Sequence, residues 1–188
     1  FYAPRSHRIQ SADACMIQDR KAQEVINCIK QWMEDFKIPP YDEKTHTGLI
    51  RHIYFRIGLS TGQVMAGVSA NSEALPHADI LAERLLCIDG VASVIHNVNQ
   101  FKTNVILGEK TNILAGLPYI EDKILDTRFR IGPLSFCQVN PYQTPRLYQA
   151  ALDAMDLNID DVLFDIYCGI GTIGLCAAKR IKKLIGIE

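Results

Sequence analysis

The chain has 188 residues, 48% of them hydrophobic, and a formal net charge of −1 at pH 7. This hydrophobic content is sufficient for a buried core and excludes wholesale disorder, and the length suits one full domain with part of a second, or two small domains. A near-neutral charge does not favour nucleic-acid binding, although a basic face can be hidden in a neutral average.

The sequence lacks the features of membrane and secreted proteins. No stretch approaches the roughly 20 apolar residues that cross a bilayer, and the first ten residues contain no apolar core of a signal peptide. The six cysteines are scattered without a C-x-x-C pair. We therefore expect a cytoplasmic protein with reduced thiols and no membrane partner. Because the chain lacks an initiating Met and stops after a predicted strand, we also expect a fragment of a longer polypeptide.

The first two thirds of the chain predict a small α+β unit. Apolar residues recur at helical spacing before Pro39, and runs rich in β-branched and aromatic residues follow. The predicted order is helix, strand, strand, helix, strand, over residues 19–36, 49–58, 63–70, 76–86 and 91–100. Residues 100–126 contain Gly, Pro and Asn and predict one further strand with connections.

The next segment predicts a short strand, a Gly-Pro turn and a helix. The helix is expected from about Pro141 to Met155. Asn140 is suited to the N-cap position, with Pro141 at the first helical position.

The segment "DVLFDIYCGIGTIGLCAAKRIKKLIGIE", residues 161–188, predicts a nucleotide-binding βαβ unit. A buried strand over 162–166 precedes Gly169, Gly171 and Gly174, which match G-x-G-x-x-G. A helix is expected over 172–181 and a second strand over 184–187, closed by Glu188. Strand, glycine turn, helix, strand and acid in this order are typical of the start of a nucleotide-binding α/β domain.

The glycine pattern alone does not identify the ligand, because dinucleotides and S-adenosylmethionine both use it. Asp165 would repel a pyrophosphate but suits a zwitterionic amino acid, and dinucleotide enzymes do not need Cys168 before the first glycine. Glu188 can accept ribose hydroxyls of either ligand. The balance favours S-adenosylmethionine over a dinucleotide. A third interpretation is that the glycines only permit close packing of helix and strand.

Several motifs resemble the RumA/TrmA-type RNA (uracil-5-)-methyltransferases. They are "LSFCQVNPYQTPRLY", "DIYCGIGTIGLCAAK" and "IGIE", with "FYAPRSHRIQSADACMIQ" and "IRHIYFRIGLSTGQVMAGV" upstream. The resemblance implies an α/β protein in which an RNA-contacting central α+β domain, residues 1–125, precedes the first βαβ unit of a Rossmann-like class I methyltransferase domain, residues 126–188. It also implies S-adenosylmethionine as cofactor and 5-methyluridine in RNA as product. The 23S ribosomal RNA branch fits best because of Cys15.

The resemblance also implies roles for individual residues. The residues that match the family's cofactor contacts are Gln138, Tyr167, Thr172 and Glu188, together with the loop glycines Gly169 and Gly171. Cys15 matches a ligand of a [4Fe-4S] cluster whose other three cysteines precede it in the family. Four ligands are needed, so this chain is not expected to hold a cluster by itself.

The family uses covalent catalysis, in which a Cys thiolate adds to carbon 6 of uracil and a carboxylate later removes the proton from carbon 5. The Asp-Pro-Pro-Arg-type segment that ends in this Cys does not occur in the 188 residues, so the chain as given is expected to be inactive. Cys168 matches a non-catalytic position. Two other functions stay open, a dinucleotide-dependent oxidoreductase and a non-catalytic RNA-binding module.

Three charged or titratable side chains on the strand predicted over 49–58 are candidate RNA contacts. They are Arg51, His52 and Arg56. The alternative is a solvated strand face, which is the more common role of such residues.

Overall fold

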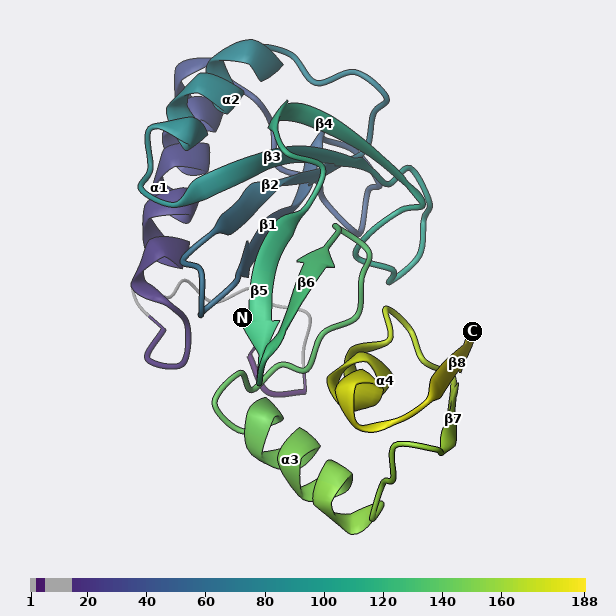
Figure 1. Ribbon diagram of the computed structural model, residues 1–188. Helices are drawn as coiled ribbons and strands as arrows, with labels where there is room; N and C mark the ends of the chain where they lie inside the picture. Colours follow the sequence, from purple (N-terminus) through teal and green to yellow (C-terminus); the bar gives the residue numbers. More distant parts are fainter. Residues whose placement is uncertain (1–2, 6–14) are drawn as a thin grey trace.

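The computed structural model describes residues 3–5 and 15–188. Most of the N-terminal motif "FYAPRSHRIQSADACMIQ" lies outside the described residues, apart from 3–5 and 15–18. The described part has a central sheet with helices on one face and a hairpin on the other, followed by a smaller C-terminal unit (Figure 1).

The central sheet has four strands in sequence order. They are β1 Ile50–Ile57, β2 Val64–Ala70, β3 Val91–Val98 and β4 Lys110–Gly116. β1 and β2 are antiparallel, β2 and β3 are parallel, and β3 and β4 are antiparallel. The parallel pair is connected by α2, Ala78–Leu86, and α1, Arg20–Asp35, precedes the sheet. The predicted order of helix, strand, strand, helix, strand is confirmed.

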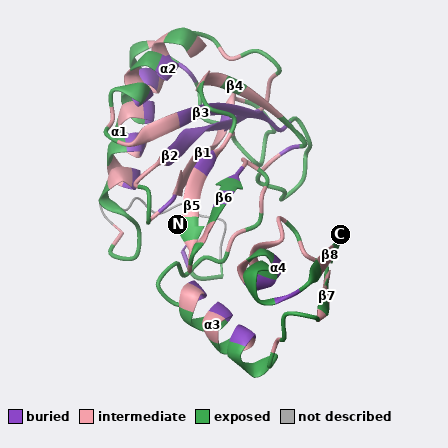
Figure 2. Ribbon diagram, viewed as in Figure 1, coloured by how far each residue is buried: buried purple, intermediate pink, exposed green. Residues whose placement is uncertain are grey.

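Helices α1 and α2 cover one face of this sheet and form the main core. Asp19 caps α1 by accepting a hydrogen bond from the backbone N–H of Lys21 at 2.9 Å. From α1, Val25, Ile29 and Trp32 are fully buried, at the helical spacing that the sequence indicated. The alternate residues of β2 complete this core, and β2 is buried along its whole length. Figure 2 shows the same concentration of buried residues in the sheet and the helix faces turned towards it.

A hairpin covers the other face of the sheet. It consists of β5, Ile120–Ile124, and β6, Thr127–Ile131. Residues 100–126 therefore contain two strands, β4 and β5, rather than the one expected, and β6 is the short strand predicted after them. Ile120, Phe129 and Ile131 of the hairpin pack with buried residues of β2 and β3 in a second core. The expected domain boundary, between residues 125 and 126, falls in the turn of this hairpin.

The C-terminal unit contains a parallel pair of strands and two helices. Its elements are α3 Thr144–Ala154, β7 Val162–Ile166, α4 Thr172–Ala177, a 3-10 turn Ala178–Arg180 and β8 Lys183–Ile187. β7 and β8 are parallel and hydrogen-bonded neighbours, as the βαβ prediction requires. Leu152, Ala177 and Ile181 form its small buried core.

Two helix boundaries differ from the prediction. The helix expected from Pro141 begins at Thr144, because Pro145 has no N–H and interrupts the helical hydrogen bonds before it. Asn140 is therefore not the N-cap of α3. Its side-chain oxygen instead accepts from the N–H of Gln143 at 3.1 Å and closes the preceding turn. The helix expected over 172–181 ends at Ala177, and the chain tightens to a 3-10 turn before Ile181.

Candidate functional site

The glycine-rich segment lies where the two parallel strands of the C-terminal unit end. We call residues 167–172, from the end of β7 to the first residue of α4, the glycine loop. The backbone N–H of Cys168 donates to the carbonyl of Ile187 at 3.1 Å, which extends the strand pairing into the loop. The N–H of Gly169 then donates to Oε2 of Glu188 at 2.7 Å. The loop and the acid that follows β8 therefore meet at the carboxyl ends of the strands, the usual place for ligands in open α/β sheets.

The glycine loop contains a strained backbone position at Tyr167. Its φ is +60°, a conformation that is rare for a bulky residue. The side chain is 89% exposed, so packing does not explain the strain. Gly169 and Gly171 also have positive φ, +56° and +75°, and space is open where a Cβ at Gly169 would lie. Strained residues of this kind concentrate at ligand-binding sites, and the open space leaves the loop backbone accessible.

The hydroxyl of Thr172 is held by a residue that the sequence did not identify. Thr172 Oγ1 and the Tyr148 hydroxyl lie 2.7 Å apart and share a hydrogen bond. Tyr148 is on α3 and is only 3% exposed. The buried positions of α3 are Thr144, Tyr148 and Leu152, and this i, i+4, i+8 spacing marks the helix face that contacts the loop. Tyr148 could have been placed on that face from spacing alone, but its partner could not.

The strand β1 anchors the turn that leads to the Q-V-N segment. Arg56 Nη1 donates to the carbonyls of Gly132 and Ser135, at 2.9 and 2.7 Å. The Tyr54 hydroxyl donates to the carbonyl of Pro133 at 2.9 Å. Burial is the main cause of a raised pKa of Tyr54. The central sheet therefore fixes the path of the chain just before Gln138, and sequence reasoning missed this contact.

Gln138 itself is exposed, and no hydrogen bond of its side chain is found within the described part of the chain. The preceding residue, Cys137, packs on the same core as Ile170 of the glycine loop. Burial raises the pKa of the Cys137 thiol, with the nearby Arg56 opposing that rise. The Q-V-N segment and the glycine loop thus pack on one shared core through Cys137 and Ile170, without a direct bond between Gln138 and the loop.

Two of the three candidate RNA contacts on β1, Arg51 and Arg56, are corrected by the structure. The Arg51 side chain is only 1% exposed and pairs with Glu43 at 3.2 Å. Its guanidinium also donates to three carbonyls of the loop that follows β3, those of Asn99, Phe101 and Thr103. Arg56 is bound to carbonyls as described. His52 is half-buried, and burial, with the nearby Arg51, lowers its pKa. Arg51 and Arg56 therefore bind the protein's own backbone and are not a solvated face.

Two other loop residues act within the fold. Asp165 Oδ2 accepts from the N–H of Gly174 at 3.0 Å, so this carboxylate joins β7 to α4. The Cys168 sulfur lies over Gly186 of β8, where an added Cβ would be 3.0 Å from it. Gly186 thus makes room for Cys168, which supports the prediction that this thiol has a packing role.

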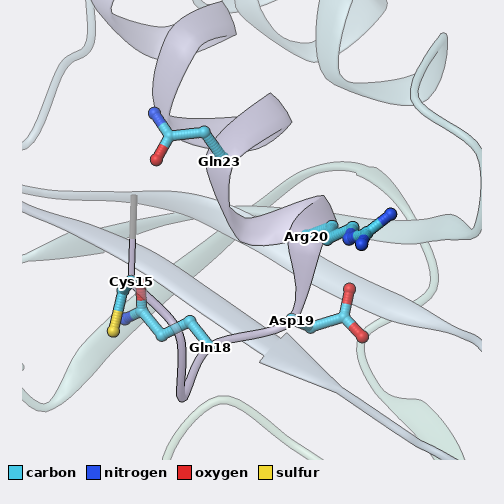
Figure 3. Close-up of a pocket in the computed structure, with 5 residues that line it drawn as sticks. All are labelled: Cys15, Gln18, Asp19, Arg20 and Gln23. Atoms are coloured by element: carbon cyan, nitrogen blue, oxygen red, sulfur yellow. The ribbon is translucent and has the colours of Figure 1, made fainter. Parts of the chain in front are cut away.

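Cys15 lies in a small pocket with Gln18, Asp19, Arg20 and Gln23 at the start of α1 (Figure 3). Among residues 3–5 and 15–188, no group of three or more His, Cys, Asp or Glu side chains could hold a metal ion. The described residues therefore do not provide an iron–sulfur site around Cys15. All six cysteines are free thiols. No helix within the described ranges is long and apolar enough to cross a membrane.

Comparisons with known proteins find relatives that match the whole of this chain. No family model matches the chain. An uncharacterized RNA methyltransferase of Clostridium tetani is 47% identical over 189 residues, covering 100% of this chain and 41% of the relative. Another, from Oceanobacillus iheyensis, is 46% identical over 190 residues, again covering 100% of this chain and 41% of the relative. The chain thus spans about two fifths of the length of these relatives.

A solved structure matches the fold. The crystal structure of Pyrococcus abyssi tRNA (uracil-54, C5)-methyltransferase in complex with S-adenosyl-L-homocysteine aligns with a TM-score of 0.79 and 26% identity. The match covers 95% of this chain and 43% of that one. It confirms the predicted α/β fold, a small α+β unit followed by a Rossmann-like βαβ unit.

Proposed function

We propose that the protein carrying this chain is an S-adenosylmethionine-dependent RNA methyltransferase that methylates carbon 5 of uracil. The observation that carries the proposal is the hydrogen bond between Gly169 and Glu188, which sets a carboxylate beside an open glycine loop at the carboxyl ends of two parallel strands. The similarity to RNA methyltransferases over the whole chain, and to a uracil-C5 enzyme in fold, supports the same function.

The geometry of the loop fits an adenosine ligand. Glu188 is exposed, and one of its oxygens is used by Gly169. The other oxygen is free to accept the ribose hydroxyls. The loop backbone at Gly169 is open to close approach by the ligand, whereas the Cβ position of Gly171 is in ordinary contact with Leu175. We therefore assign Glu188 to the ribose and the two glycines to the loop that holds the nucleoside.

The remaining site residues are assigned to the other end of the ligand. Tyr167 presents an exposed ring at the end of β7, suited to packing beside the adenosine or the sulfonium. Gln138 offers an amide donor and acceptor to the amino-acid end. Thr172, held by Tyr148, is positioned where α4 begins. When bound, S-adenosylmethionine supplies a methyl group that replaces the hydrogen on carbon 5 of uracil, with release of S-adenosylhomocysteine and a proton.

We assign residues 1–125 to an RNA-contacting central domain and residues 126–188 to the beginning of the cofactor domain. Since the position of Cys15 favours the ribosomal branch in the sequence, we propose 23S ribosomal RNA as the substrate, and hence a cytoplasmic location. Among residues 3–5 and 15–188 no three His, Cys, Asp or Glu side chains come together around Cys15, so this chain's described residues do not fit a cluster.

The test is tritium release. RNA carrying [5-³H]uridine loses tritium to water when carbon 5 is methylated, so release that depends on S-adenosylmethionine reports the reaction directly. The protein that carries this chain is incubated with labelled 23S ribosomal RNA and, separately, with labelled tRNA. Release from the ribosomal RNA supports the proposal in full. Release from tRNA alone overturns the substrate assignment, and methyl transfer without tritium release overturns carbon 5 as the target.

A further inference from the structure

The hairpin β5–β6 has one buried and one exposed face. Ile120, Phe129 and Ile131 point to the core of the central sheet. Asp122, on the same face, accepts from the backbone N–H and the hydroxyl of Ser60, at 2.9 and 2.6 Å. The hairpin is thus docked firmly through this face, and the side chains that alternate with it point outward.

The outward face carries three cations, Lys123, Arg128 and Arg130, and one carboxylate, Glu121, opposite Arg130. We call it the basic hairpin face. Lys123 and Arg128 are directly opposite each other in the strand pairing. Like charges opposite each other destabilise a hairpin, and an apolar or acidic residue at either position would avoid this cost. Asp126 Oδ1 lies 3.4 Å from Lys123 Nζ and offsets that charge, whereas Arg128 has no ion-pair partner among residues 3–5 and 15–188. The unpaired Arg128 is therefore better explained by an anionic partner than by the stability of the hairpin.

The two arginines of this face are available to such a partner. Arg130 is 69% exposed, and its guanidinium lies over the Tyr119 ring, 4.7 Å from the centroid. Its Nε is 3.5 Å from Glu121 Oε1, and its terminal N–H groups make no hydrogen bond or ion pair with any described residue. Arg128 is exposed and makes no hydrogen bond or ion pair with any residue in 3–5 or 15–188. Guanidinium groups bind phosphate in a planar, two-pronged manner.

The hairpin that carries the basic face also adjoins the candidate site. β6 continues directly into the turn that Arg56 anchors and then into the Q-V-N segment. At the other end of the hairpin, the Cys176 thiol of α4 lies 3.6 Å from the carbonyl of Ile124. A strand of nucleic acid lying on the hairpin would therefore lead towards the glycine loop.

We propose that the basic hairpin face binds the phosphate backbone of a single-stranded segment of the substrate RNA, with Arg128 and Arg130 as the principal contacts. The inference rests on the proposed function. It replaces the β1 arginines, which bind backbone carbonyls, as the candidate RNA contacts. Arg128 and Arg130 lie just after the proposed boundary at residue 125, on a hairpin that packs against the central sheet. Planar guanidinium groups beside an aromatic ring are typical of surfaces that bind single-stranded nucleic acids.

The test measures binding of the full chain to a fluorescein-labelled single-stranded oligoribonucleotide by anisotropy, at several salt concentrations. The R128Q/R130Q variant is expected to bind about tenfold more weakly than the native chain. Its plot of log affinity against log salt is expected to be shallower by about 1.4, since each phosphate contact to a single strand contributes about 0.7. The matched control is K30Q/K37Q, which removes the same charge from exposed positions on and just after α1. The control is expected to bind RNA like the native chain.

Three outcomes would overturn the proposal. They are no RNA binding by the native chain, an unchanged slope in R128Q/R130Q, and an equal loss in the control variant. Displacement of the RNA by polyglutamate of equal charge, with equal affinity, would indicate an acidic protein partner instead. S-Adenosylhomocysteine binding is measured in the same samples. If R128Q/R130Q binds S-adenosylhomocysteine normally and RNA as tightly as the native chain does, the basic hairpin face is rejected as the RNA site and the proposed function stands. If the native chain does not bind S-adenosylhomocysteine, the proposed function is rejected.

Discussion

The carboxylate of Glu188 accepts a 2.7 Å hydrogen bond from the backbone N–H of Gly169. This bond joins the end of β8 to the glycine loop across nineteen positions of sequence. It orients the carboxylate and stabilises the loop before any ligand binds. The cofactor site that we propose is therefore largely pre-formed, which reduces the entropy lost on binding.

The first prediction concerns this carboxylate. Glu188→Gln keeps the shape and one acceptor oxygen but removes the charge. Hydrogen bonds to charged groups contribute about 1.5–3 kcal/mol and neutral ones about 1, so affinity for S-adenosylhomocysteine should fall about tenfold. Titration calorimetry measures the change. Glu24→Gln, at an exposed position on α1, is the control and should bind normally. Equal affinity in both variants would remove Glu188 from the site.

A second prediction tests the packing of α4 on β7. A Cβ added at Gly174 would lie 2.7 Å from Asp165 Oδ2 and 2.8 Å from Leu184 Cδ1. Gly174→Ala gains about 1 kcal/mol of helix propensity, but overpacking costs about 1–3 kcal/mol. We expect a net loss of stability in urea denaturation. Gly132→Ala serves as control, because its Cβ would approach only Ser135 Oγ, at 3.6 Å. A Gly174→Ala protein as stable as the control would contradict the described contact.

The third prediction concerns the link between Tyr148 and Thr172. Tyr148→Phe and Thr172→Val each remove one hydroxyl of the 2.7 Å hydrogen bond. Because Tyr148 is buried, each change should cost about 0.5–1.5 kcal/mol of unfolding free energy. The double variant should lose less than the sum, because both changes break the same bond. Strict additivity in the double-mutant cycle would show that the two hydroxyls do not interact.

A fourth prediction concerns pH. Burial is the main cause of lowered pKa values for both His52 and His96, and His96 is only 2% exposed. Their folded-state pKa values therefore lie below the unfolded value of about 6.5. As pH falls through 6.5 the unfolded state binds more protons, so stability decreases until pH is below the folded values. We expect a lower urea midpoint at about pH 6 than at about pH 7.5, with a smaller difference in His52→Gln. Equal midpoints at both pH values would contradict this account.

Sequence patterns identified most of the fold because each depends on local spacing. The helical period of Val25, Ile29 and Trp32 and the glycines after β7 marked α1 and the βαβ unit correctly. The start of α3 was misplaced because Pro145, not Pro141, determines where helical hydrogen bonding can begin. One such error moves a boundary by a few residues and leaves the element itself correctly identified.

The contacts around the site could not be predicted in the same way. Arg56 donates to Gly132 and Ser135, which are 76 and 79 residues away in sequence. A charged residue on a strand looks the same in sequence whether it faces solvent or a distant carbonyl. The Tyr148–Thr172 bond likewise depends on how α3 packs against α4. Local patterns contain no information on these long-range pairings.

The most direct test of the account is whether the full chain binds S-adenosylhomocysteine. Titration calorimetry on the chain, with folding checked by circular dichroism in the same buffer, should give one site per chain. NADH, titrated in parallel, should not bind, because Asp165 at the end of β7 disfavours a pyrophosphate. A folded chain that binds NADH and not S-adenosylhomocysteine would contradict the cofactor assignment and support a dinucleotide-dependent oxidoreductase.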